Sequence, residues 1–93
     1  MTSDETVRFI DNFVKSNMSY LNNISLARLE FLSLWLQSHP DTSTMNSQDR
    51  DALCLLLHSL ASSNFYTDET KTCWSQIAQD LKSYSLGIAS SRF

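Results

Sequence analysis

The chain has 93 residues, a net charge of −3 and 42% hydrophobic residues, but only one glycine, Gly87, and one proline, Pro40. Hairpin-rich β folds need glycine at positive-φ turn positions and phosphate-binding loops need clustered glycines, so the composition excludes both. A chain of this length and apolar content can bury one hydrophobic core but not two. We therefore expect a single helical domain over residues 1–93.

The first predicted helix covers residues 4–21. Thr2 or Ser3 supplies its N-cap, and the Thr2-x-x-Glu5 spacing matches a capping box. Apolar residues fill one half of the helical wheel, which predicts a half-buried amphipathic helix. The polar half holds Arg8, Asp11, Asn12, Lys15 and Ser19. Asn17 alone falls in the apolar half, where a satisfied buried amide or a helix-end position explains it more simply than a ligand contact.

The second predicted helix covers residues 24–38, with Asn22 or Asn23 as its cap. It ends before Pro40, because proline forces the preceding residue out of the helical region. Nine of the 13 residues from position 24 to position 36 are apolar. The polar strip consists of Glu30, Ser33 and Gln37, with Leu26 among them. A helix with so little polar surface is expected to be buried on most sides.

The third and fourth predicted helices cover residues 48–62 and 68–86. Asn46 or Ser47 caps the third and Thr67 caps the fourth, while Gly87 has the place of a C-terminal cap before a frayed tail at 88–93. The apolar stripes are Leu53, Leu56, Leu57 and Leu60 on the third helix, and Cys73, Trp74, Ile77, Ala78, Leu81 and Tyr84 on the fourth. Short connections favour antiparallel neighbours, so the fold class is an all-α bundle of four amphipathic helices.

The two cysteines, Cys54 and Cys73, lie in apolar helical runs without a C-x-x-C spacing. This pattern favours small buried residues over a disulfide scaffold. The chain begins with a polar segment rather than a signal sequence, and its apolar runs are far shorter than the roughly 20 residues of a membrane span. We therefore expect a cytoplasmic protein without a membrane partner.

No arrangement of residues points to catalysis or to a cofactor. The paired carboxylates fall in predicted first turns, where the helix dipole explains them, and no ligand spacing joins His39 or His58 to other metal ligands. The seven basic residues are scattered, whereas nucleic-acid binding needs clustered cations. The sequence therefore predicts a non-enzyme with no metal, cofactor or nucleic acid.

One residue of the second helix stands out. Arg28 lies in the middle of the apolar face, where its helical neighbours are Ile24, Phe31, Leu32 and Trp35. Arginine and tryptophan are enriched at binding hot spots, so these five residues form the candidate partner-binding site. Two other interpretations stay open: Arg28 at the rim of the bundle with its head group in water, or Arg28 buried in a salt bridge to another helix.

The second helix also carries more apolar residues than an isolated bundle needs, and such a surplus marks an interface. We expect a small protein–protein interaction module, a regulator, inhibitor, adaptor or small subunit, that forms homodimers through its first and second helices. The alternative is a bundle that binds a small ligand in an internal aromatic pocket. That pocket would be lined by Arg28, Trp35, Trp74 and Tyr84. A nucleic-acid-binding regulator is the third and weakest hypothesis.

Overall fold

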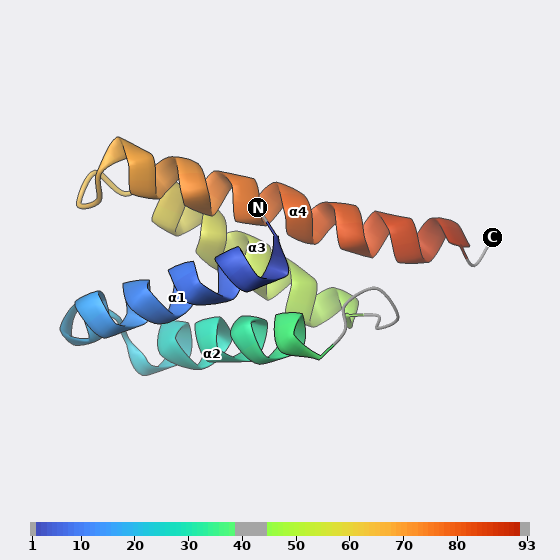
Figure 1. Ribbon diagram of the computed structural model, residues 1–93, viewed down its shortest axis with the longest axis horizontal. Coiled ribbons are helices and arrows are strands. Elements are labelled where there is room, and N and C mark those ends of the chain that lie inside the picture. Colours follow the sequence, from blue (N-terminus) through green and yellow to red (C-terminus); the bar gives the residue numbers. More distant parts are fainter. Residues whose placement is uncertain (1, 39–44, 92–93) are drawn as a thin grey trace. The chain divides into compact units, whose positions relative to one another are not determined.

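The computed structural model describes residues 2–38 and 45–91, with side chains up to residue 82. These residues contain four α-helices and no strand, which confirms the all-α fold class. The helices are α1 (Ser3–Asn17), α2 (Asn23–Gln37), α3 (Ser47–Ser62) and α4 (Asp68–Ser91), with a short 3-10 helix, η1 (Met18–Tyr20), after α1 (Figure 1). The chain divides into two units, residues 1–43 and 44–93, and each is described by itself. That they form a single domain stays a prediction.

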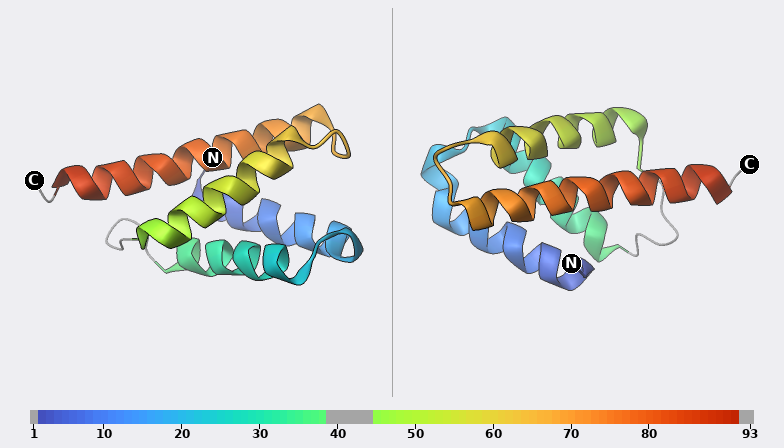
Figure 2. Two further views of the ribbon diagram at one scale, coloured as in Figure 1. Left: turned by 180° about the vertical axis from the view of Figure 1, so that it is seen from behind. Right: turned by 90° about the horizontal axis from the view of Figure 1, so that it is seen from above.

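The first unit is a helical hairpin. Helices α1 and α2 pack side by side, and η1 with two further residues turns the chain back between them (Figure 2). The apolar side chains of this unit that are almost fully buried are Ile10, Phe13, Leu29, Leu32 and Leu36. Antiparallel neighbours, as expected from the short connection, are therefore present in this unit.

The second unit is also a hairpin, in which α4 runs back along α3. Its buried apolar side chains are Leu53, Leu57, Leu60, Trp74, Ile77, Ala78 and Leu81. These are the stripes predicted for the two helices, with Leu56 only half-buried; the side chain of Tyr84 lies outside the described ones. Cys54 and Cys73 are free and half-buried, so the expectation that they are core residues is too strong.

The predicted N-terminal caps are confirmed. Thr2 accepts a hydrogen bond from the backbone N–H of Glu5 at 3.2 Å, and the Glu5 carboxylate accepts one from the Thr2 N–H at 3.1 Å. Asn22, Asn46 and Thr67 cap α2, α3 and α4 in the same way, each by accepting a backbone N–H with its side-chain oxygen. Four N-terminal caps encoded in the sequence therefore fix where each helix begins.

Two helix ends differ from the predictions. Helix α1 ends at Asn17, whose amide donates to the Phe13 carbonyl at 2.9 Å, and the chain continues as η1. Helix α4 continues past Gly87 to Ser91, so the expected cap at Gly87 is wrong. Glycine in a helix costs about 1 kcal/mol relative to alanine, which weakens a helix without ending it. Pro40, the expected stop of the second helix, lies outside the described residues.

Candidate functional site

One side of α2 carries exposed apolar side chains. Ile24 is 62% exposed, Phe31 40% and Leu34 58%. The expectation that α2 is buried on most sides is therefore wrong. Its buried side holds Leu29, Leu32 and Leu36, while Ile24, Phe31 and Leu34 remain at the surface.

These exposed residues follow a regular spacing. Ile24, Ala27, Phe31 and Leu34 are separated by three, four and three positions, the spacing of the contact positions in a coiled coil. Ser33 faces α1, since it donates a hydrogen bond to Asp11, and Ile24 lies about 180° around the helix from it. Ile24, Ala27 and Phe31 thus point away from α1, whereas Leu34, about 100° from Ser33, lies at the border and also lines a groove shared with α1. We call Ile24, Ala27, Phe31 and Leu34, with Arg28 and Trp35 along one edge, the α2 outer face.

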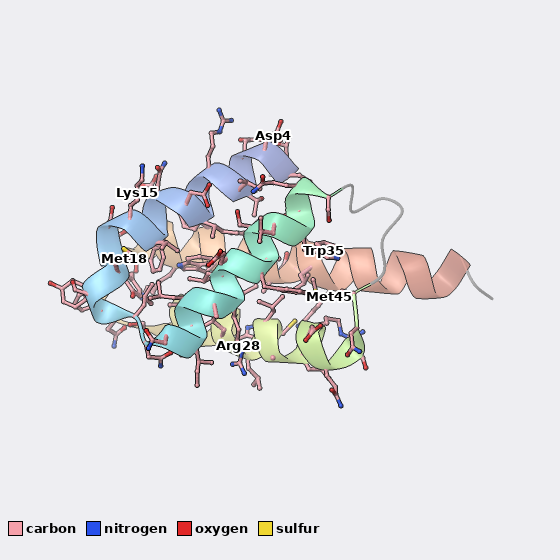
Figure 3. All side chains as sticks on the ribbon, turned by 90° about the horizontal axis from the view of Figure 1, so that it is seen from below. Asp4, Lys15, Met18, Arg28, Trp35 and Met45 are labelled. Atoms are coloured by element: carbon pink, nitrogen blue, oxygen red, sulfur yellow. The ribbon has the colours of Figure 1, made fainter. Side chains whose placement is uncertain are left out.

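The structure separates the five predicted site residues. Ile24, Arg28 and Phe31 are exposed and Trp35 is half-buried, all on the α2 outer face, whereas Leu32 is only 1% exposed and belongs to the core. Figure 3 shows Arg28 on the side of α2 that faces away from α1. Because Arg28 is exposed, the interpretation as a buried salt bridge is wrong. The sequence reasoning missed Ala27 and Leu34, which the three-four-three spacing would have identified.

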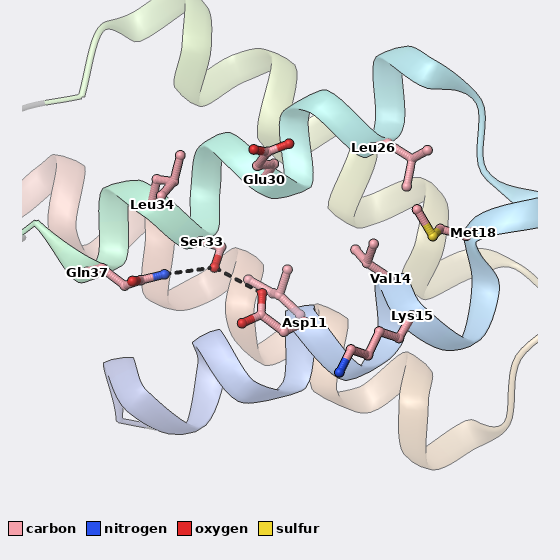
Figure 4. A pocket seen from close by; sticks show the side chains of 10 residues that line it. Asp11, Val14, Lys15, Met18, Leu26, Glu30, Ser33, Leu34 and Gln37 are labelled. Carbon is pink, nitrogen blue, oxygen red and sulfur yellow. Dashed lines mark hydrogen bonds between the residues drawn. The ribbon is translucent and has the colours of Figure 1, made fainter.

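A groove of about 580 Å³ runs between α1 and α2 (Figure 4). We call it the hairpin groove. From α1 and η1 it is lined by Ile10, Asp11, Val14, Lys15 and Met18, and from α2 by Leu26, Glu30, Ser33, Leu34 and Gln37. None of the four residues expected around an aromatic pocket is among them. The polar strip of the second helix therefore contributes to this groove and to the contact with α1.

One end of the groove holds the polar side chains of Asp11, Ser33 and Gln37 beside the exposed Leu34, and the other end is apolar. At the polar end, Ser33 donates to Asp11 at 3.2 Å and accepts from the Gln37 amide at 3.3 Å. The Ser33 hydroxyl is buried, and these two bonds satisfy its capacity to donate and to accept a hydrogen bond. At the other end, Met18 and Leu26 face each other across the groove.

Two opposite charges, Lys15 and Glu30, lie one on each of the two helices that form the groove. Lys15 is four residues after Asp11 on α1, and Glu30 is three residues before Ser33 on α2. In an antiparallel pair both steps lead in the same direction, by about 6 Å and about 4.5 Å from the Asp11–Ser33 bond. Figure 4 shows Glu30 near the Asp11–Ser33 end of the groove and Lys15 closer to the Met18–Leu26 end, one on each helix.

A metal site, a membrane-spanning helix and a known relative would each be a further indication of function. Within residues 2–38 and 45–91, no group of three or more His, Cys, Asp or Glu side chains is placed to hold a metal ion. Over the same ranges, no helix combines the length and apolar character needed to span a membrane. No family model, no curated protein and no solved structure matches the chain. Among the described residues, the α2 outer face and the hairpin groove are therefore the candidate functional surfaces.

Proposed function

We propose that this protein is a small non-catalytic interaction module, a regulator, inhibitor, adaptor or small subunit, that binds an α-helix of a protein partner and also self-associates. The observation that carries the proposal is the exposed row of Ile24, Ala27, Phe31 and Leu34 on α2. A row with this spacing is the surface that a second amphipathic helix covers when two helices pack along their length.

The dimensions of the row suit such a partner. From Ile24 to Leu34 the helix rises about 15 Å, or three turns. Covering exposed apolar side chains contributes about 25 cal/mol per Å² removed from water, which is the main attraction at this surface. Ala27, a small residue in the middle of the row, allows close approach of the partner helix.

The edge of the row indicates the charge of the partner. Arg28 is exposed beside Phe31, with the half-buried Trp35 next to it. An acidic side chain on the partner helix would meet the Arg28 guanidinium there, in the kind of pair that fixes orientation more than it adds affinity. The proposed partner is thus an amphipathic helix with an apolar row and a carboxylate along one edge.

The test uses a photo-crosslinking side chain in place of Ala27, with the same group in place of Leu55 as control. Leu55 is a 72% exposed apolar residue on α3, outside the α2 outer face. We expect a crosslinked protein from position 27 whose adduct maps to an amphipathic helix, and no such adduct from position 55. Phe31→Glu should abolish the adduct. Equal labelling from both positions, or adducts unaffected by Phe31→Glu, would refute the proposal.

A further inference from the structure

We infer that the α2 outer face binds a helix of a different protein rather than α2 of a second copy, and that this helix is acidic along one edge and basic along the other. This inference rests on the proposed function, and it names the chemistry of the partner at the same row of residues. Self-association is thereby left to another surface of the chain.

The two edges of the row carry opposite charges. Arg28 lies about 80° to one side of the middle of the row, and Glu30 lies about 80° to the other side. Both residues are exposed, so a helix that covers the row meets both. Charged side chains at such flanking positions set the choice and the direction of a partner helix. A helix with carboxylates beside Arg28 and with ammonium or guanidinium groups beside Glu30 is attracted along both edges.

The side chains along the row also differ in size. Ala27 is the smallest, and it lies between Ile24 and Phe31. Together with Arg28, these exposed residues occupy positions i, i+3, i+4 and i+7, the set of four that forms a hole for one side chain of a facing helix. Because alanine fills little of this hole, a large apolar side chain of the partner fits opposite Ala27 and a smaller one fits opposite Phe31.

A second copy of α2 that runs antiparallel matches the sizes but not the charges. A two-fold axis that places Ala27 of each copy opposite Phe31 of the other passes between the helices at position 29. The same axis places Arg28 beside Arg28 along one edge and Glu30 beside Glu30 along the other. Like charges repel each other, and such contacts exclude a wrong partner.

A second copy that runs parallel matches the charges but not the sizes. Each Arg28 then lies on the edge that carries Glu30 of the other copy, but every residue of the row faces itself. Phe31 meets Phe31, and about one turn away Ala27 meets Ala27, so the large pair keeps the helices apart where the small pair leaves a gap. Neither two-fold arrangement satisfies both size and charge, whereas a helix of different sequence can satisfy both.

The experiment compares three synthetic helical peptides that share one apolar row and differ only at the flanking positions. The mixed peptide is acidic along one edge and basic along the other, the second peptide is basic along both edges, and the third is acidic along both. Binding to the full chain is measured by fluorescence anisotropy of the labelled peptide. We expect the mixed peptide to bind about fivefold more tightly than the other two, because each of those meets one edge with a like charge. Phe31→Glu should remove the binding of all three.

Charge variants of the protein should change this preference. Arg28→Glu makes both edges of the row acidic and should favour the basic peptide, whereas Glu30→Lys makes both edges basic and should favour the acidic peptide. Lys82→Glu changes the net charge as Arg28→Glu does, at an exposed position on α4, and should leave the preference for the mixed peptide unchanged. Since the net charge of the chain is −3, non-specific attraction would instead favour the basic peptide.

A second measurement tests the exclusion of a second copy. The purified chain with the photo-crosslinking side chain in place of Ala27 is irradiated alone and with the mixed peptide. We expect peptide adducts and no crosslinked dimer, even at concentrations at which sedimentation equilibrium shows a dimer.

The outcomes separate this inference from the proposed function. Equal affinities for the three peptides, a preference for the basic peptide in every variant, or a crosslinked dimer from position 27 would overturn the inference and leave the row as a helix-binding surface. If none of the three peptides binds, the proposed function and this inference are both refuted.

Discussion

At the scale of single residues, the start of α1 depends on Thr2. Its hydroxyl oxygen accepts the Glu5 N–H at 3.2 Å, an amide that has no partner within the helix. We expect Thr2→Ala to lower the free energy of unfolding by about 1 kcal/mol, measured by urea denaturation. The control is Ser16→Ala, an exposed interior position of α1, where alanine should be neutral or slightly stabilising. An equal loss in both variants would contradict the assignment of the cap.

The same cap gives the protein a pH dependence. Hydrogen bonds from the backbone and then the side chain of Thr2 lower the pKa of the Glu5 carboxyl from its usual 4.5. A lowered pKa in the folded state means that the stabilisation is present above about pH 4.5 and is lost as the pH falls through the folded-state value. We expect the difference in melting temperature between the unmodified chain and Glu5→Gln to shrink in acid. A difference independent of pH would contradict this.

Ser33 of α2 forms a hydrogen bond with Asp11 of α1. Its hydroxyl is buried, donates to Asp11 and accepts from Gln37. Ser33→Ala removes both bonds, and we expect a loss of about 1 kcal/mol in the free energy of unfolding. Ser25→Ala, at a half-buried position on the same helix, is the comparison. Denaturation curves that coincide for the two variants would show that the bonds contribute nothing.

At the scale of the elements, α3 shows how sharply a helix divides into two sides. Leu57 is fully buried, whereas Leu55 is 72% exposed, as its place among polar residues on the helical wheel predicts. We expect Leu57→Ala to lower the free energy of unfolding by about 2–5 kcal/mol, because it removes buried methyl groups and leaves a cavity. Leu55→Ala should change it by less than about 0.5 kcal/mol. Similar losses for the two leucines would refute the burial pattern.

Helix α2 departs from this simple division. Leu29, Leu32 and Leu36 form its buried side, yet Ile24, Phe31 and Leu34 remain exposed on another. One row packs in the fold, and the proposed function assigns the exposed row to a partner helix. This duplication is the physical basis of the proposed function.

At the scale of the whole molecule, self-association links stability to concentration. When a dimer unfolds to two separate chains, each tenfold increase in protein concentration stabilises the folded dimer by about 1.4 kcal/mol. We expect the melting temperature of the unmodified chain, followed by circular dichroism, to rise with concentration. A melting temperature independent of concentration in the unmodified chain would argue against a dimer.

The sequence by itself determined the fold class, the four helices and the residues at which they begin. These features are local: the 3.6-residue period and the caps at Thr2, Asn22, Asn46 and Thr67 act over one or two turns. The candidate site was predicted in part, since Ile24, Arg28, Phe31 and Trp35 do lie on one face of α2.

Only the tertiary structure decided which apolar row of α2 is buried and that the strip with Glu30, Ser33 and Gln37 lines a groove with α1. A helical wheel shows which residues share a face, but it does not show which face the neighbouring helix covers. The Asp11–Ser33 bond joins residues 22 positions apart, and a contact of that range follows from the register of two packed helices. That register is set by the packing of the two helices against each other, which no local pattern in either helix specifies.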